Sequence, residues 1–187
     1  METDRLHAGA AAAKAARPIR RPLGDGDAGA VLSRCGRYRY SLHRTWNAAL
    51  PVITFVLLNP STADAWRLDP TATRCVRRAE AMGFGGVRLV NLFALRCTDP
   101  DALHRDKDPV GPDNDAATLA ACRGAVMVVC GWGREGCWAG RDQVVLALLA
   151  AADVPLHYLG LNANGTPKHP LYVGYDIKPA PWLAETR

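Results

Sequence analysis

Asparagine and histidine side chains stand where apolar runs of this sequence stop. Asn59 directly follows the run 52–58, Asn91 lies in the run 87–93, and His169 follows the run 156–159 after a loop. An asparagine amide offers an acceptor and donors, so it can position a neutral water or read the edge of a polar heterocycle. A histidine nearby can stabilise a developing oxyanion or leaving group. These residue types indicate a polar site that brings little formal charge to its ligand.

Strand-like runs alternate with helix-like stretches along the chain. Strands are predicted over 52–58, 87–93, 125–130 and 156–159, and helices over 69–82, 116–122 and 140–152. This alternation is typical of parallel βαβ units and predicts a three-layer α/β/α sandwich with a mainly parallel sheet of about four core strands. Because the carboxyl ends of parallel strands share one edge of a sheet, the loops after these strands are expected to form one rim.

The N-terminal part of the sequence differs from the rest. Residues 1–30 are rich in Ala, Gly, Arg and Pro without a sustained apolar period, which predicts a mobile tail. Tyr38, Tyr40 and Leu42 alternate with polar residues, which favours an antiparallel strand or hairpin ahead of the main sheet. We therefore expect a tail over 1–30 and a single α/β domain over 31–187. The acidic stretch 99–108 is expected to be a surface loop.

Composition narrows the class of protein. The 187 residues, 49% of them hydrophobic, suffice for one domain with a sizeable core. No apolar run reaches the roughly 18 residues that cross a bilayer, so we expect a cytoplasmic protein with no membrane partner. The six cysteines and five histidines are scattered, which predicts neither a metal nor a cofactor. The formal net charge of +5 permits a nucleic acid or nucleotide as partner and indicates no particular protein partner.

Several motifs resemble known families. The runs YRYSL, LLNPSTAD, VNLFALR, DPVGPDND and HPLY, within residues 36–182, resemble the bacterial and phage family catalogued as domain of unknown function 1643. More distantly, the chain resembles the uracil-DNA glycosylase superfamily, which has a four-stranded parallel sheet in an α/β/α sandwich. Asn59-Pro60, Asn91 and His169-Pro170 stand where that superfamily has its three motifs. Leu57 replaces the superfamily's glycine and no serine follows Pro170, so the pocket is expected to differ.

The second resemblance implies an N-glycosidic hydrolase that acts on a nucleobase, modified or unmodified, in nucleic acid or in a nucleotide. Asn59, with Asp64, would position the attacking water, and His169 would stabilise the charge on the departing base. Asn91 would read the edge of the base, and the side chains of Asn59, Asn91 and His169 are expected to converge on one pocket. The further residues expected to contact substrate are Pro60, Ser61, Thr62, Phe93, Arg96, Trp132, Lys168, Leu171 and Tyr172.

Other interpretations of the same residues stay open. Asn59-Pro60 is also a common way to end a strand, Asn91 could pair with a loop backbone, and His169 could anchor its loop. Gly131-Trp132-Gly133 is typical of a tight turn as well as of a nucleotide-binding one. A non-catalytic module that binds a nucleobase, nucleotide or nucleic acid, and a small-molecule nucleotide-modifying enzyme, are the alternative functions. The arginines of the helix over 69–82 are expected on its solvated face: Arg74, Arg77 and Arg78.

Overall fold

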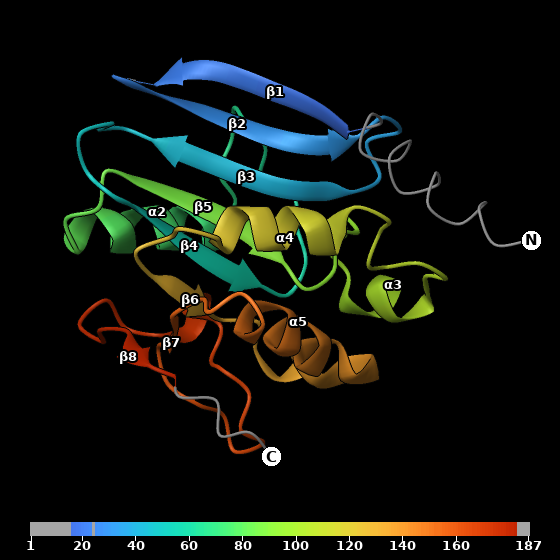
Figure 1. Ribbon diagram of the computed structural model, residues 1–187. Helices are drawn as coiled ribbons and strands as arrows, with labels where there is room; N and C mark the ends of the chain where they lie inside the picture. The colour runs from blue at the N-terminus through green and yellow to red at the C-terminus, as the bar shows by residue number, and fades with distance from the viewer. Residues whose placement is uncertain (1–15, 24, 183–187) are drawn as a thin grey trace, which may run out of the picture.

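A single mixed sheet of eight strands runs through the computed structural model, which describes residues 16–23 and 25–182 (Figure 1). The strands are β1 (Ala16–Leu23), β2 (Gly26–Ser33), β3 (Arg39–Thr45), β4 (Val52–Leu57), β5 (Gly86–Asn91), β6 (Val128–Cys130), β7 (Leu156–Tyr158) and β8 (Ala180–Pro181). They lie side by side in the order β1-β2-β3-β5-β4-β6-β7-β8. The α/β class expected from the sequence is confirmed.

The four strands at the centre of the order, β5-β4-β6-β7, are parallel to one another. They correspond to the four strands predicted from the apolar runs. Antiparallel strands flank them, with β3, β2 and β1 on one side and β8 on the other. The sheet as a whole is therefore mixed, rather than mainly parallel as expected, because the chain outside the βαβ units also pairs with it.

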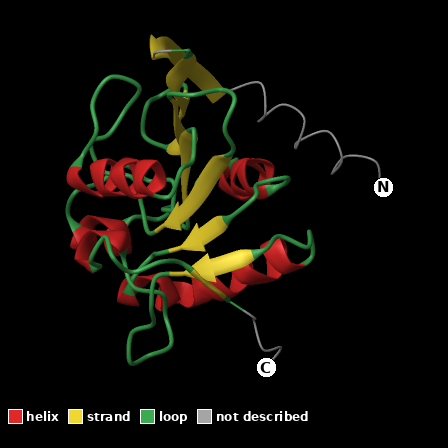
Figure 2. Ribbon diagram, turned by 90° about the vertical axis from the view of Figure 1, so that its left-hand side faces the viewer, coloured by secondary structure: helices red, strands yellow, loops and turns green. Residues whose placement is uncertain are grey.

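Helices cover both faces of the parallel strands. The described residues contain α2 (Pro70–Ala81), α3 (Pro100–Arg105), α4 (Asn114–Cys122) and α5 (Arg141–Ala150). In Figure 1, α4 lies in front of the sheet and α2 behind it, and Figure 2 shows helices on either side of the strands. Alternate residues of β4 enter two cores, since Phe55 packs with Cys75 of α2 whereas Val56 packs with Val145 of α5. None of these described helices has the length and apolar character needed to span a bilayer.

The sheet begins earlier in the chain than expected. Strands β1 and β2 form an antiparallel hairpin within the stretch that we assigned to a mobile tail over 1–30. Ala28 and Ala30 of β2 are buried, which makes this hairpin part of the folded domain. The expected tail is therefore wrong for 16–23 and 25–30, and its first part, 1–15, lies outside the described residues. Helix α3 likewise forms within the stretch 99–108 that we expected to be a loop.

A β-bulge in β3 changes which face of the sheet its alternate side chains occupy, since Tyr40 packs in the core of α4 and α5 whereas Leu42, two residues on, packs in the core of α2. Val31 pairs with Ser41 while Leu32 pairs with Arg39, so Tyr40 is the extra residue. A bulge bends the strand and changes the direction of the side chains around it. Tyr40 packs in the core beneath α4, whereas Arg39 reaches the turn after β4 on the side of α2. Arg39 lies on the face opposite Tyr38 and Tyr40, as strand alternation requires, and brings a charged group to the rim.

The arginines of α2 do not share a solvated face as expected. Arg78 is 1% exposed, and its guanidinium donates to the carbonyls of Val173, Gly174 and Ile177. Arg74 also donates to the carbonyl of Val173. Arg77 alone of the three is exposed. The expectation is wrong because the segment after β7 returns across α2, a contact between distant parts of the sequence that the local pattern does not carry.

Candidate functional site

The loops that follow the four parallel strands are hydrogen-bonded to one another in neighbouring pairs. After β4 and β5, the N–H of Cys97 donates to the carbonyl of Pro60 at 3.0 Å. After β6 and β7, the N–H of Gly133 donates to the carbonyl of Pro167 at 2.9 Å. The loops are therefore joined in two pairs at the carboxyl ends of the strands, the edge of the sheet at which parallel pairing places all four loops, here called the rim.

The amide of Asn59 is fixed by its nitrogen. Nδ2 of Asn59 donates to the carbonyl of Cys97 at 2.9 Å and to that of Pro60 at 3.2 Å. Its Oδ1 makes no hydrogen bond to any part of the chain that the structure describes, so it can accept one from a ligand or a water. Asn59 thus joins the two loops and keeps one acceptor available.

Asp64 closes the same turn through its carboxylate. Its Oδ1 accepts the N–H groups of Trp66 and Arg67 at 2.7 and 2.8 Å. Burial opposes the ionised form, but these two hydrogen bonds and the charge of Arg96 outweigh it and hold the pKa of Asp64 below its ordinary value. Asp64 is therefore ionised at neutral pH, with one oxygen engaged in the turn.

The guanidinium of Arg39 occupies the space beside Asn91. Arg39 is 2% exposed, and it donates to the carbonyl of Ala63 at 2.7 Å and to Oδ1 of Asn91 at 3.4 Å. Burial lowers the pKa of Arg39 to about 10, and the nearby charge of Asp69 acts in the opposite direction. Sequence reasoning missed Arg39, because alternation with Tyr38 and Tyr40 indicates only that it lies on the face opposite the tyrosines. The turn after β4 covers that face, a contact between distant parts of the chain that the local pattern does not carry.

Asp69 connects the start of α2 to the turn after β4. Its Oδ1 accepts the N–H of Ala72 at 2.8 Å, which confirms the predicted helix start, and its Oδ2 accepts the N–H of Ala63 at 3.3 Å. The charge of Asp69 also acts on Arg39 and His169, raising the pKa of each against the effect of burial. Asp69 therefore lies near both side chains. The sequence identified it as a helix cap and not as part of the site.

His169 is a neutral imidazole of defined tautomer. Its Nδ1 accepts the N–H of Leu171 at 3.4 Å, so the ring proton lies on Nε2. Burial lowers the pKa of His169 below its ordinary value of 6.5, while the charge of Asp69 opposes this shift. The ring also packs on Tyr172, with centroids 5.9 Å apart. At neutral pH, His169 therefore offers an uncharged N–H donor.

The turn after β6 is shaped by close backbone contacts. A Cβ atom on Gly131 would lie 2.7 Å from Cδ of Pro170, which is closer than carbon atoms pack. Gly133 has a φ of 76°, in the left-handed region that favours glycine. Both glycines are therefore explained by a tight turn that lets the His169-Pro170 segment lie against β6.

The remaining residues predicted to contact substrate fall into several groups. Phe93 and Trp132, both predicted to contact substrate, are each 1% exposed in the core beneath α4 and α5, so their side chains do not lie on the surface of the rim. Pro60 is buried, Leu171 is half-buried and Lys168 is exposed. Tyr172 is 81% exposed beside His169.

Three predicted residues, Ser61, Thr62 and Arg96, line a cavity of about 410 Å³ on the rim. The other lining residues are Gly36, Arg37, Cys97 and Thr98. Asn59, Asn91 and His169 are not among them, so the structure does not bring the three expected residues together in this cavity. Asn91 faces Arg39, and Asn59 reaches the cavity only through its contact with Cys97.

Comparison with known protein families matches residues 39–171 to a family described as protein of unknown function (DUF1643). The matched segment runs from β3 to the His169-Pro170 turn and includes Asn59 and Asn91. No curated protein and no solved structure matches the chain.

Proposed function

This chain belongs to the DUF1643 family, and we propose that it hydrolyses an N-glycosidic bond to a nucleobase in nucleic acid or in a nucleotide. The observation that carries the proposal is the neutral imidazole of His169, whose Nε2 holds a proton at the rim of the sheet. A base leaving a sugar takes the bonding electrons with it and becomes anionic. A fixed, uncharged N–H donor stabilises such a leaving group.

Asn59 supports the same chemistry from the neighbouring loop. Its Nδ2 is held by two carbonyls, so the direction of Oδ1 is fixed. That oxygen can accept a hydrogen bond from a water and orient the attacking lone pair. An amide does not take up the proton at neutral pH, so its contribution is to orientation. Asp64, ionised at neutral pH, has a second oxygen that could receive a proton.

The sheet architecture also supports a likeness to the uracil-DNA glycosylase superfamily. Four adjacent parallel strands with helices on both faces agree with the core of that superfamily. The motif residues Asn59, Asn91 and His169 follow or end β4, β5 and β7 in the same order. Within this proposal, the antiparallel strands on either side are additions to that core.

One observation favours a second candidate, a module that binds a nucleobase or nucleotide without chemistry. Oδ1 of Asn91, the atom expected to read a base edge, already accepts from Arg39. The side chain is 1% exposed, so a ligand would have to displace Arg39 to reach it. A binding module needs only the rim cavity and not this rearrangement.

Single-turnover excision assays separate these two functions. Duplex and single-stranded oligonucleotides carrying uracil, hypoxanthine, mismatched or hypermodified bases are incubated with the protein, and free base is quantified. The hydrolase proposal expects release of at least one base. Folded protein that binds nucleotide and releases no base would establish the binding module instead.

Replacing Asn59 with alanine is expected to lower the rate of that release by about tenfold, the loss of one orienting hydrogen bond. Asn162 provides the matched control, because its amide also holds a rim loop through the carbonyl of Thr166. The Asn162→Ala variant is expected to retain the wild-type rate. Equal losses in the two variants would point to general loosening of the loops and would contradict a water-orienting role.

The pH dependence of excision tests the state of His169. Because its pKa in the folded protein lies below 6.5, His169 stays neutral at and above that pH. His169 is therefore expected to cause no loss of rate between about pH 9 and 6.5. A loss is expected as the pH falls through the folded pKa, because a proton on Nδ1 breaks the contact with the N–H of Leu171 that fixes the ring. The stability that its neutral form contributes is likewise present above 6.5 and lost on further acidification, since the unfolded chain binds the proton first. Rates of base release and free energies of urea unfolding, measured across this pH range, check the two expectations. A fall in rate centred above pH 6.5 would contradict a lowered pKa of His169.

A further inference from the structure

The rim cavity is lined entirely by neutral or cationic groups. Arg37 and Arg96 contribute guanidinium groups, and Ser61, Thr62 and Thr98 contribute hydroxyls. None of these lining residues, all within the described chain, carries a carboxylate. Such a set of N–H and O–H donors, on loops that follow the three strands β2, β4 and β5, is suited to an oxyanion with acceptors on several sides.

Arg96 has most of its donors available. Its Nη1 donates to the carbonyl of Gly36 at 3.2 Å, which fixes the guanidinium against the neighbouring loop. Its Nε is buried and has no partner among the described residues. The backbone N–H of Arg96 is also bonded, to the carbonyl of Arg37 at 3.0 Å. The charge of Arg96 is thus held in place at the cavity, where it acts on the carboxylate of Asp64 but forms no direct ion pair with any carboxylate of the described residues.

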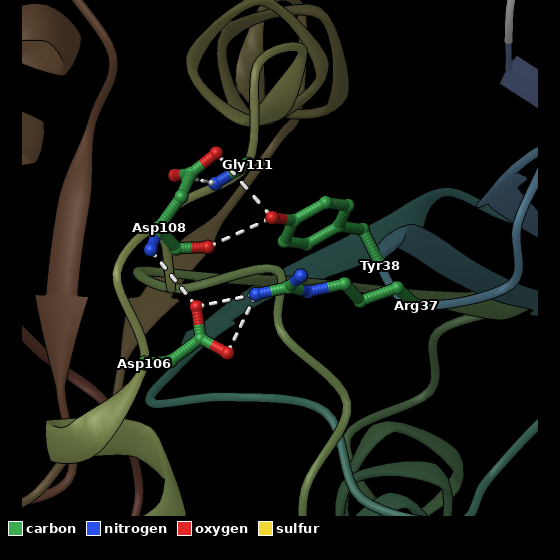
Figure 3. Close-up of polar contacts among 5 residues, drawn as sticks. All are labelled: Arg37, Tyr38, Asp106, Asp108 and Gly111. Atoms are coloured by element: carbon green, nitrogen blue, oxygen red, sulfur yellow. Dashed lines mark hydrogen bonds and ion pairs between the residues drawn. The ribbon is translucent and has the colours of Figure 1, made fainter.

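Arg37 is held at the edge of the same cavity by an acidic loop. Figure 3 shows its guanidinium against Asp106, with Nη2 at 2.5 and 2.6 Å from the two carboxylate oxygens. Asp106 in turn accepts the N–H of Asp108, whose carbonyl accepts the hydroxyl of Tyr38. This network holds Arg37 in position, and the carboxylate of Asp106 neutralises much of the charge of the Arg37 guanidinium.

We propose that this cavity binds the phosphate group of a nucleotide unit, with Arg96 as its principal cation. Arg37 is a second cation, and its pairing with Asp106 limits its contribution. The cavity adjoins the proposed reacting centre, because Ser61 follows Asn59-Pro60 in one turn and Asn59 is bonded to Cys97 of the cavity wall. The identity of the ligand as a nucleotide rests on the proposed function; the binding of a phosphate group does not.

Calorimetric titration tests the proposal with inorganic phosphate, a nucleoside 5′-monophosphate, the matching nucleoside and an oligonucleotide. The monophosphate is expected to bind more tightly than the nucleoside. Arg96→Gln is expected to weaken its binding by about 10 to 100-fold, the loss of charge-assisted hydrogen bonds. Arg34, exposed and outside the cavity, gives the control: Arg34→Gln removes the same charge and should leave affinity unchanged. Equal binding by wild type and Arg96→Gln, or equal losses in both variants, would overturn the proposal.

A second variant tests the phosphate-binding proposal if Arg96→Gln does not fold. Asp106→Asn keeps the oxygen that accepts the N–H of Asp108 and removes the negative charge opposite Arg37. Affinity for phosphate is then expected to rise about threefold or more; an unchanged or lower affinity would overturn the proposal.

Tight binding of the oligonucleotide would identify a phosphodiester as the ligand, and binding of the monophosphate alone would identify a terminal phosphate. Phosphate binding that depends on Arg96 without any base release would refute the hydrolase while leaving this subsite established.

Discussion

Replacing His169 with alanine is expected to lower the rate of base release by about 10²–10³-fold, the usual loss when one donor to a developing anion is removed. The neutral ring already holds its proton on Nε2, so the donor costs no reorganisation during bond cleavage. Affinity for the intact nucleotide is expected to stay within about threefold of wild type, because the charge on the base develops only in the transition state. Single-turnover rates and equilibrium titration measured on the same substrate separate these two effects.

A conservative variant distinguishes a chemical role of His169 from a structural one. Glutamine can present an N–H near the position of Nε2, so His169→Gln is expected to recover part of the rate that alanine loses. Thermal unfolding of both variants reports on the loop, since each loses the contact between Nδ1 and the N–H of Leu171. Wild-type rates in both variants, with the protein folded, would show that the imidazole donor takes no part in the reaction.

Replacing Arg39 with methionine is expected to lower the free energy of unfolding by about 2–4 kcal/mol. The substitution leaves the carbonyl of Ala63 and Oδ1 of Asn91 without their donor in a buried setting. Relief of the buried guanidinium's desolvation offsets part of that loss, and methionine keeps the apolar stem packed. Urea unfolding, analysed as a two-state transition, measures the change.

Arg77 is the matched control for this substitution. It is an exposed arginine of α2, so Arg77→Met removes the same charge from a solvated position. Its free energy of unfolding is expected to stay within about 0.5 kcal/mol of wild type. If Arg39→Met were equally neutral, the hydrogen bonds of Arg39 would contribute no net stability, and Ala63 and Asn91 would have to find other partners.

The parallel core could be predicted because its signal is local. Strands buried on both faces need long apolar runs, and β4 has one, as does β5 apart from Arg88. The hairpin of β1 and β2 has no such signal, because packing against residues far along the chain determines which residue types it can contain. Gly29 illustrates this: a Cβ there would lie 2.5 Å from Cε1 of His43, across the pairing of β2 and β3. From the sequence alone, a glycine that close packing requires cannot be distinguished from a glycine in a flexible segment.

The candidate site, like the fold, could be predicted from the sequence only in part. Loop residues that follow strands could be located on the rim, since parallel topology alone places them there. The surroundings of each side chain could not be predicted, because they depend on the turn after β4 for Arg39 and on core packing for Phe93 and Trp132. Arg37 was missed for a similar reason: only the fold brings it beside Arg96.

The composition of β1 bears on how this protein behaves at high concentration. Among the described residues, β1 is one outer strand of the sheet and the two-residue β8 is the other. An incoming strand from another molecule would need free N–H groups along β1, and Pro18 and Pro22 have none. Exposed Arg17 and Arg20 add like charges to any such pairing. The long antiparallel extension therefore enlarges the sheet without offering a template for aggregation.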